Sequence, residues 1–465
     1  MVNADAGGYD PRMPALTLPA FTRRRLLLAG AGSLAAIVAG PLRAQVKLPP
    51  LGLSERRLAN GLQVVALPLA GGGTVAAQMW YRVGSKDDPA GRSGFAHLFE
   101  HMMFKRTRHM ADEMFDRLTE DVGGVNNAFT AADTTAYQSE VPSNHLERLL
   151  WAEADRLAHL EVDQAAFDSE RAVVKEEYRE RVETSPYGRL LNALPTFAYE
   201  RHPYKRPGIG NIAELDAATL ADVRDFHATY YRPDNATLIV AGDFDPAQLA
   251  RWVDRHFGRL PRPEGAVPRV TVSEPQRTQG RREKLVAPNV PLPAVALLWQ
   301  GPRAAHPDAP ALQVAAALLA GGDSSRLHEA LVYRARSAQA AGLSADLNAD
   351  AGMIAAYAIA ASGAKLDTLE AALQAEIERL ARGPVSSAEL DKVRTQLLTA
   401  KVDERQTPQG QAAALGWAQV MHGDLREAER ELARLQAVRA SDVQRVLRQH
   451  LLQRPHISVE YRSAA

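Results

Sequence analysis

His97 and His101 stand four residues apart, and Glu100 comes directly before the second histidine. Side chains at positions i and i+4 of an α-helix lie on one face. Two neutral imidazoles placed in this way can bind one Zn²⁺ ion, and a neighbouring carboxylate can take a proton from a water molecule that the ion activates. The pattern therefore indicates a site for hydrolytic chemistry, provided that the segment is helical.

The residues around this pattern predict a largely buried helix. Apolar residues interleave with the polar ones at 98–99 and 102–104, and Ser93 stands where a helix N-cap is expected. A surface helix with two solvated histidines is the alternative, but buried His and Glu side chains need partners. The order H-x-x-E-H is the inverse of H-E-x-x-H and is the inverzincin signature, so metal binding is the favoured interpretation.

The composition of the whole chain narrows the function classes. Its 465 residues carry 55 basic and 55 acidic side chains and are 46% hydrophobic, which is ordinary for a soluble protein of two or three domains. A net charge of zero gives no reason to expect binding to nucleic acid or to a charged membrane. There are no cysteines, so a metal site must use His and carboxylate ligands.

Residues 1–44 are predicted to be an export signal. Arg23–Arg25 precede an apolar run from Leu26 to about Val38, and small residues follow. The paired arginines resemble a twin-arginine signal, while the ordinary secretory route is almost as well matched. An uncleaved anchor is the alternative, but the run is shorter than the ~20 residues that span a bilayer. We therefore expect a periplasmic protein with no stable membrane span.

Strands and helices mixed without strict alternation predict an α+β fold. In the first half we expect strands over 58–69, 74–83, 125–130, 137–141 and 236–241. The motif helix follows the second strand, and further helices are expected over 144–181, with a break near Asp163, and over 219–230. In the second half we expect a strand over 294–299 and helices over 308–320, 324–335, 365–382 and 387–403.

A segment rich in proline and charge divides the chain. We expect a catalytic metal-binding domain over 45–260, a linker over 261–290 and a related domain over 291–465. Leu215 and Asp222 recur as Leu435 and Asp442, and each copy leads through a helix and a proline into a strand. This similarity indicates a duplicated domain, in which the second copy lacks the H-x-x-E-H motif.

A third protein ligand is needed, because two histidines and a water leave a catalytic zinc ion short of one. The best source elsewhere in the first half is an acidic helix with one apolar face, which contains Glu170, Glu176 and Glu177. Glu176 and Glu177 lie about 100° apart around a helix, so only one of the two can face the metal.

With this helix included, the chain resembles the pitrilysin/insulinase family of zinc peptidases, to which the mitochondrial processing peptidase belongs. That family pairs H-x-x-E-H with a glutamate at a fixed distance, and Glu177, 76 residues after His101, lies at that distance. The resemblance implies one Zn²⁺ per chain, with His97, His101 and Glu177 as ligands and Glu100 as general base. Glu170 corresponds to a second acidic residue that assists catalysis. The implied fold is a pair of related α/β-sandwich domains.

The segment Asn127-Ala128-Phe129 also matches the family. There an exposed strand edge accepts the substrate peptide as an added strand, and the asparagine holds the peptide backbone. The resemblance thus implies substrate-binding roles for Asn127, Ala128 and Phe129, while a plain turn residue is the alternative for Asn127. The segments 202–204 and 231–235 match as well, and we expect them to be structural.

The second half departs from the family pattern. Active single chains of the family carry an Arg and a Tyr at a fixed spacing after a Gly-Gly-x-x-Ser-Arg-Leu segment, which is present here at 321–327. In this register the two positions hold Val332 and Gln339, which supply neither a guanidinium nor a phenol. The resemblance then implies a heterodimer with a metal-less sister subunit that contributes the pair.

These residues together predict zinc-dependent hydrolysis of peptides or unfolded polypeptides. A non-catalytic peptide-binding or assembly subunit of the same fold is the first alternative, favoured by the missing Arg/Tyr pair and disfavoured by the complete metal motif. A zinc hydrolase acting on other substrates is the second alternative. The Asn127-Ala128 segment argues against it, because that segment implies an extended peptide ligand.

Overall fold

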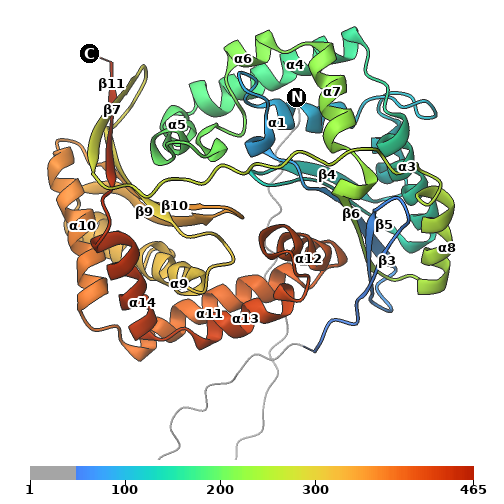
Figure 1. Cartoon of the computed structure of the whole chain (residues 1–465). Coiled ribbons are helices and arrows are strands. Elements are labelled where there is room, and N and C mark those ends of the chain that lie inside the picture. The colour runs from blue at the N-terminus through green and yellow to red at the C-terminus, as the bar shows by residue number, and fades with distance from the viewer. Residues whose placement is uncertain (1–48, 465) are drawn as a thin grey trace, which may run out of the picture. The chain divides into compact units, whose positions relative to one another are not determined.

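Two β-sheets organise residues 49–464, the part of the chain that this computed structural model describes (Figure 1). The predicted export signal, residues 1–44, lies outside the described residues. The strands of the first sheet are β1 (Ser54–Arg57), β2 (Gln63–Pro68), β3 (Thr74–Tyr81), β4 (Val125–Thr130), β5 (Thr135–Pro142) and β6 (Ala236–Gly242). Those of the second are β7 (Arg281–Ala287), β8 (Ala294–Gly301), β9 (Ala338–Leu347), β10 (Gly352–Ala360) and β11 (Ile457–Ser463).

Helices connect and cover these strands. In the first half they are α1 (Phe95–Met102), α2 (Met114–Glu120), α3 (Leu146–His159), α4 (Gln164–Tyr178), α5 (Gly188–Ala198), α6 (Ile212–Ala217), α7 (Leu220–Tyr230) and α8 (Pro246–His256). In the second they are α9 (Ala309–Ala320), α10 (Leu366–Arg382), α11 (Ser387–Glu404), α12 (Pro408–His422), α13 (Glu427–Ala437) and α14 (Ala440–Leu447). Three π-helical turns follow helical segments, namely η3 (Arg179–Thr184), η6 (His328–Arg334) and η7 (Arg448–Leu452).

The second sheet repeats the connectivity of the first. The strand orders are β1-β2-β6-β3-β5-β4 and β7-β11-β8-β10-β9. β2 and β6 are parallel neighbours, as β7 and β11 are, and each following pair is antiparallel in both sheets. Only β1 has no counterpart in the second sheet. This shared topology confirms the predicted α+β class and the duplication.

Most expected elements occur within a few residues of their expected bounds, with three differences. The first long strand begins at Gln63, because Leu58–Leu62 form a tight turn in which Gly61 has a φ of +98°. The helix expected over 324–335 is largely the π-helical turn η6. Residues 281–287, which we expected in the linker, form strand β7 and pair with β11.

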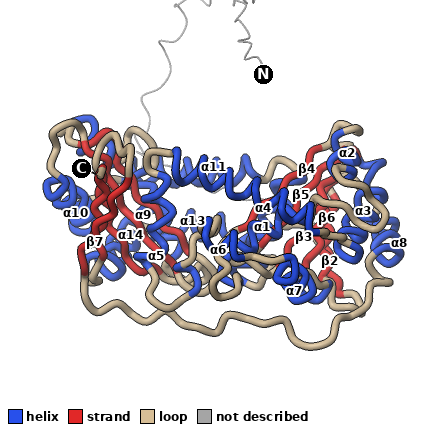
Figure 2. The backbone as a smooth tube through the Cα atoms, turned by 90° about the horizontal axis from the view of Figure 1, so that it is seen from above, coloured by secondary structure: helices blue, strands red, loops and turns tan. Residues whose placement is uncertain are grey.

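The remainder of the expected linker runs as a long loop between the halves (Figure 2). Side chains of this loop bind the first half. The Glu274 carboxylate accepts hydrogen bonds from the backbone N–H groups of residues 200–202, and Arg277 donates to the Ala198 carbonyl. Because these bonds hold the segment at residues 274 and 277, it differs from the free spacer that a proline-rich composition indicates.

Both faces of the first sheet are covered, which explains why the central strands β3 and β6 are apolar on both sides. Leu238 and Val240 of β6 pack into one core with Phe99 of α1. The alternate residues Ile239 and Ala241 pack into a different core with Leu415 of α12. Helix α1, which carries His97 and His101, and helix α12 from the second half therefore lie on opposite faces of one sheet.

Helix α12 approaches the first sheet closely at Gly416. A Cβ atom built on Gly416 would lie 2.0 Å from Cε2 of Trp80 on β3. Trp417 packs edge-on against Trp80, with ring centroids 5.4 Å apart, and stacks on Phe129 of β4. Only a glycine fits between α12 and the indole on β3. The stacking of Trp417 on Phe129 also packs α12 against β4, the strand that carries Asn127.

Replacing Gly416 with Ala is therefore expected to destabilise the protein by about 1–3 kcal/mol, the usual cost of forcing a methyl group into a packed core. Urea unfolding followed by tryptophan fluorescence measures the change. Gly72→Ala is the matched control, because nothing lies within 4 Å of a Cβ atom at Gly72. Equal stability of the two variants would show that α12 does not pack on Trp80.

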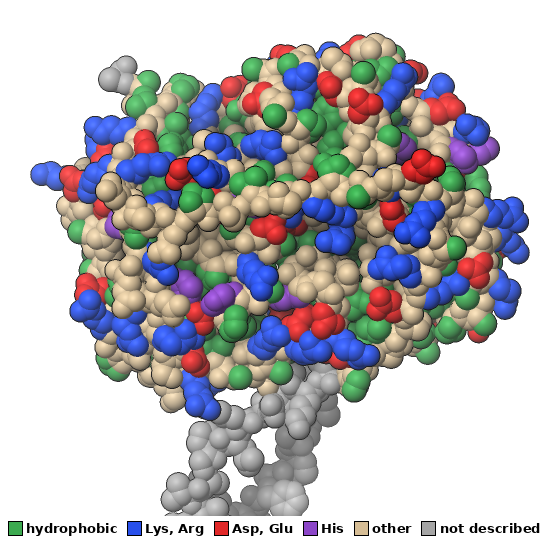
Figure 3. Space-filling view, in the orientation of Figure 1, with side chains coloured by type: hydrophobic (Ala, Val, Ile, Leu, Met, Phe, Trp, Pro, Cys, Tyr) green, Lys and Arg blue, Asp and Glu red, His purple; other side chains and the backbone are tan. Residues whose placement is uncertain are grey.

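The surface is mixed in charge. Basic and acidic side chains are interspersed over the face shown in Figure 3. None of the helices between residues 49 and 464 combines the length and the apolar character needed to cross a bilayer.

Candidate metal centre and active site

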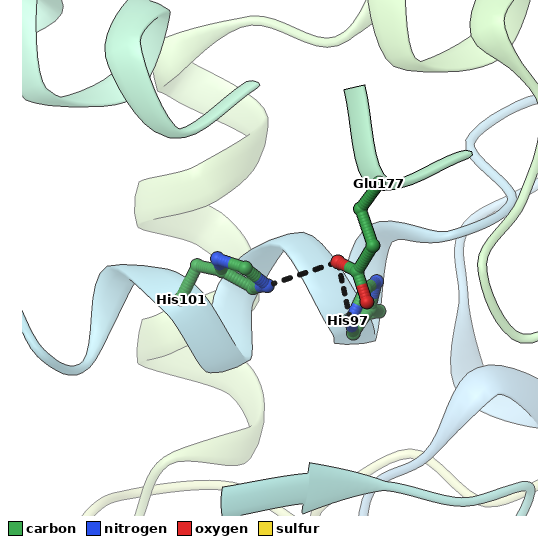
Figure 4. Close-up of side chains that lie close together, drawn as sticks. All are labelled: His97, His101 and Glu177. Carbon is green, nitrogen blue, oxygen red and sulfur yellow. Dashed lines mark ion pairs between the residues drawn. The ribbon is translucent and has the colours of Figure 1, made fainter. Parts of the chain in front are cut away.

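Three donor atoms from two helices converge in the first half. Oε2 of Glu177, near the end of α4, lies 3.5 Å from Nε2 of His97 and 3.6 Å from Nε2 of His101 on α1 (Figure 4). Two ligand atoms that share a tetrahedral zinc ion are separated by roughly 3.3 Å, given zinc–ligand bonds of about 2.0–2.1 Å. The spacing and chemistry of this donor set therefore fit one Zn²⁺ ion.

Glu176, the competing candidate from the sequence, points elsewhere. Its carboxylate pairs with Arg179 at 2.8 Å on the exposed side of α4. The structure thus brings Glu177, and not Glu176, to the two histidines, as the rotation of about 100° per helical residue requires.

The apolar residues of α1 orient the histidines. Phe95, Leu98, Phe99 and Met102 are buried in the core beneath the sheet, which leaves His97, Glu100 and His101 on the opposite, half-buried face. This division follows from the 3.6-residue period of the helix. The ring of Phe99 lies 4.2 Å from that of Tyr231, and this contact helps to hold the helix on the core.

The start of α1 differs from the sequence prediction. The helix is preceded by Gly94, at a φ of +84°, and Ser93 does not cap it. The carboxylate of Asp88 takes this role instead, since it accepts hydrogen bonds from the backbone N–H groups of Gly94 and Ala96, both at 2.8 Å. A carboxylate from outside the helix thus satisfies two of its free amides.

The environments of the two histidines are opposite. Burial lowers the pKa of His97 to about 4, so its ring is neutral, and its buried Nδ1 has no hydrogen-bond partner within residues 49–464. Burial also lowers the pKa of His101, but hydrogen bonds to Glu170 and Glu177 outweigh it and raise that pKa to about 9. A cation between these groups would offset the same carboxylate charges that now favour a protonated His101.

Glu170 lies behind His101. Its Oε2 is 3.3 Å from Nδ1 of His101, and its Oε1 is 2.6 Å from Nζ of Lys105. Burial raises the pKa of Glu170, but its bonds to His101 and Lys105 lower it by more, so the carboxyl group is ionised. A carboxylate on the far nitrogen of a metal-binding histidine fixes the orientation of the ring.

Glu100 stands beside the three donors without being one of them. Its Oε2 accepts a hydrogen bond of 2.6 Å from the hydroxyl of Thr130, at the end of β4. Burial raises the pKa of Glu100 above its ordinary value, against the opposing effect of this hydrogen bond. A carboxylate in such surroundings is suited to accept a proton and release it again.

Strand β4 forms one wall of the cleft above these groups. The cleft has a volume of about 950 Å³, and Asn127, Ala128 and Phe129 line it together with the residues of α1 and α4. Among the described residues, β4 pairs with β5 alone and ends the first sheet, so its other edge is unpaired there. The side chain of Phe129, however, stacks on Trp417, which leaves its backbone as the part available to a ligand.

Three contacting residues were not among the predicted site residues. Thr130 binds Glu100, Lys105 binds Glu170, and Arg181 of η3 pairs with Oε1 of Glu177 at 2.7 Å. The contact of Arg181 could have been predicted from the sequence, because Arg181 stands four residues after Glu177 on a helical segment. Thr130 belongs to the segment that resembles the family, but nothing in the sequence pointed to its contact with Glu100 or to that of Lys105 with Glu170, since only the tertiary structure brings these partners together.

The positions of the missing Arg/Tyr pair contribute nothing to this cleft. Val332 is half-buried against the second core, and Gln339 is exposed on the edge strand β9. The neighbouring Tyr333 is 70% exposed, and Arg334 pairs with Glu329. None of these four residues of the second half lines the cleft.

Fold and donor set together define the class of metallopeptidases whose motif reads H-x-x-E-H. The family model described as "Insulinase (Peptidase family M16)" matches residues 64–211, and that described as "Peptidase M16 inactive domain" matches residues 217–397. The chain belongs to the insulinase family, peptidase family M16.

Individual relatives agree with this assignment. "Zinc protease PqqE" of Helicobacter pylori is 33% identical over 377 residues, which cover 80% of this chain and 84% of the relative. The crystal structure of a protease from Helicobacter pylori has a TM-score of 0.85 at 30% identity and covers 89% of this chain and 99% of that one. The probable mitochondrial-processing peptidase subunit beta of Arabidopsis thaliana is 25% identical over 402 residues, covering 85% and 75%. Relatives named as zinc proteases support a metalloprotease function.

Proposed function

We propose that this chain is a zinc endopeptidase that hydrolyses peptides or unfolded polypeptides. The observation that carries the proposal is the convergence of His97, His101 and Glu177 beside a fourth, uncoordinated carboxylate, Glu100. One Zn²⁺ ion per chain is expected at the three donors. When bound, the ion supplies Lewis acidity, which polarises a carbonyl group and acidifies water.

Proton transfer and the positioning of the ligands are carried out by side chains of this chain. Glu100 takes the proton of the attacking water and afterwards gives a proton to the leaving amine. Thr130 holds one oxygen of that carboxylate, so the other oxygen remains available for the proton. Glu170, itself held by Lys105, fixes the ring of His101. Glu170, which also lines the cleft, acts in this mechanism through His101 as a positioning residue.

An extended peptide is the substrate form that the cleft favours. The free edge of β4 offers backbone groups to an added strand, and Asn127 extends this edge. In the structure, Oδ1 of Asn127 accepts a hydrogen bond from the N–H of Ala128 at 2.8 Å. The backbone hydrogen bonds made by this edge would not depend on the side chains of the bound peptide. Such binding suits substrates of varied sequence that have no folded structure.

Thr130→Val is expected to lower kcat by about 10- to 100-fold with little change in KM, because a hydrogen bond to a charged group contributes about 1.5–3 kcal/mol. Val keeps the shape of Thr and replaces the hydroxyl, which donates to Glu100 and lies 3.4 Å from the hydroxyl of Thr135, with a methyl group. Thr130→Ser restores the hydroxyl and should recover most of the activity, and zinc content should be unchanged in both variants. A change in KM without a change in kcat would mean that Thr130 contributes to peptide binding at the edge of β4 and not to the action of Glu100.

We further propose that a metal-less sister subunit of the same family completes the site. The support is the side chains at Val332 and Gln339, which cannot stabilise a developing oxyanion. The Arabidopsis relative is itself named as a subunit. Purified alone, the chain is then expected to hydrolyse peptides slowly, and the heterodimer purified from the native host should be faster. Full activity of the isolated chain would refute the sister subunit.

A non-catalytic peptide-binding or assembly subunit is the competing function. It is favoured by the same missing pair and by the match of residues 217–397 to a domain described as inactive. Cleavage of a mixed peptide library by the zinc-loaded heterodimer, with and without a chelator, separates the two functions. Binding of peptides without any zinc-dependent cleavage would leave only the non-catalytic function.

Export to the periplasm stays a prediction from the N-terminal sequence.

A further inference from the structure

A second group of metal-binding side chains lies away from the catalytic helix. Asp155 and His159 stand four residues apart on one face of α3, and His109 reaches them from the loop before α2. One donor atom from each of the three lies within 4.8 Å of the others. The rings of His109 and His159 meet edge to face, with centroids 5.3 Å apart.

The carboxylate at the centre of this group is buried and fixed. The side chain of Asp155 is 3% exposed, and within residues 49–464 its ion-pair partner is His109, with Nδ1 and Oδ1 2.6 Å apart. Its other oxygen, Oδ2, accepts a hydrogen bond from the hydroxyl of Thr107. No Lys or Arg between residues 49 and 464 pairs with this buried carboxylate, so a cation bound here would take the place of the His109 proton without meeting a fixed positive charge.

The loop that carries His109 is tied to the end of α3. The hydroxyl of Thr107 also accepts hydrogen bonds from the backbone N–H groups of His109 and Met110. The N–H of Arg108 donates to the carbonyl of His159 at 3.0 Å. His109 is thus held over His159 before any ligand arrives, while its side chain remains 51% exposed and open to solvent.

We propose that His109, Asp155 and His159 form a second site for a divalent transition metal, separate from the catalytic one. Two imidazoles and one carboxylate are ligands that zinc accepts, with water in the fourth position. The ion replaces the proton between His109 and Asp155, and the two donor atoms move apart from 2.6 Å to roughly 3.3 Å. The half-exposed ring of His109 is free to make this shift.

The other His/Asp/His group of the described residues differs from this one in its charge environment. His306, Asp308 and His450 also come within 4.8 Å of one another. There, however, Oδ1 of Asp308 pairs with Arg445 at 2.7 Å, so the carboxylate is already neutralised and a guanidinium lies beside it. An added cation would meet this positive charge, and we expect no metal at Asp308.

Equilibrium dialysis of the full chain against ZnCl₂, with the bound zinc measured by atomic absorption, tests the second site. The wild type is expected to bind two ions per chain, and His97→Ala/His101→Ala and His109→Ala/His159→Ala one each. The variant lacking all four histidines should bind none. His145→Ala/His422→Ala is the matched control and should bind two, and circular dichroism checks that each variant is folded.

The outcomes separate the two sites. Loss of all zinc from folded His97→Ala/His101→Ala would overturn the second site and leave the catalytic one intact. One ion retained by the variant lacking all four histidines would also overturn it, because the ion would lie elsewhere. If His109→Ala/His159→Ala binds none while His97→Ala/His101→Ala binds one, the second site holds and the catalytic assignment fails.

Discussion

Glu100→Gln is expected to leave the zinc content unchanged and to lower kcat by about 10²- to 10⁴-fold, the usual contribution of a general base. Gln has the shape of Glu and can still accept the hydrogen bond from Thr130 through its carbonyl oxygen. It cannot take a proton from water at neutral pH. Cleavage of a fluorogenic peptide by the chain, assayed with the proposed sister subunit present, measures the activity, and zinc analysis of the same preparation measures the metal content.

Glu120→Gln provides the control for this experiment, because it makes the same chemical change at an exposed position of α2 outside the cleft. It should be as active as the wild type. Turnover by Glu100→Gln at the wild-type rate would remove Glu100 from the mechanism. Loss of zinc from that variant would instead make Glu100 a ligand, which its hydrogen bond to Thr130 and its absence from the converging donors argue against.

Glu177→Ala and Glu176→Ala are expected to differ sharply in metal binding, although the two residues are adjacent. Glu177→Ala removes one of three protein donors. Removing a residue that only hydrogen-bonds to a metal ligand weakens metal affinity by roughly 10- to 100-fold, and we expect a larger loss of zinc affinity here. Glu176→Ala removes a carboxylate at the rim of the cleft that pairs with Arg179 and is not one of the converging donors, and an exposed pair of this kind contributes little in water. Competition with a chromophoric chelator gives both affinities.

Because Glu176 and Glu177 are adjacent, Glu176→Ala is a closely matched control for Glu177→Ala. Both substitutions delete one carboxylate from the same turn of α4, so a general loss of negative charge or of helix stability affects them alike. Equal zinc affinity in the two variants would contradict the assignment of Glu177. A weaker affinity in Glu176→Ala alone would mean that α4 is rotated by one residue relative to α1.

Metal binding is favoured by the way the donors are held. The core residues of α1 and the N-cap of α4 at Asp163 fix the two helices independently of any ion. Glu177 is further held by Arg181, and His101 by Glu170. Because these side chains are already placed, little conformational entropy remains to be lost when an ion binds.

The sequence predicted the local part of this site, because that part depends on short spacings. The interval from His97 to His101 places both rings on one helical face, and the apolar residues between them indicate which face is buried. Alternating polarity and turn residues likewise predicted strands β4 and β5 and the break at Asp163. The choice of Glu177 over Glu176 came from the family resemblance, since helical geometry alone allowed either one.

Only the tertiary structure decided which distant groups meet. Thr130 reaches Glu100, and Lys105 reaches Glu170, through contacts that no periodic pattern encodes. Gly416 is required by an indole on a strand more than three hundred residues earlier, and His109 joins α3 through a loop. Local spacing fixes the direction of a side chain on its own element, whereas a partner on another element depends on how the whole chain packs.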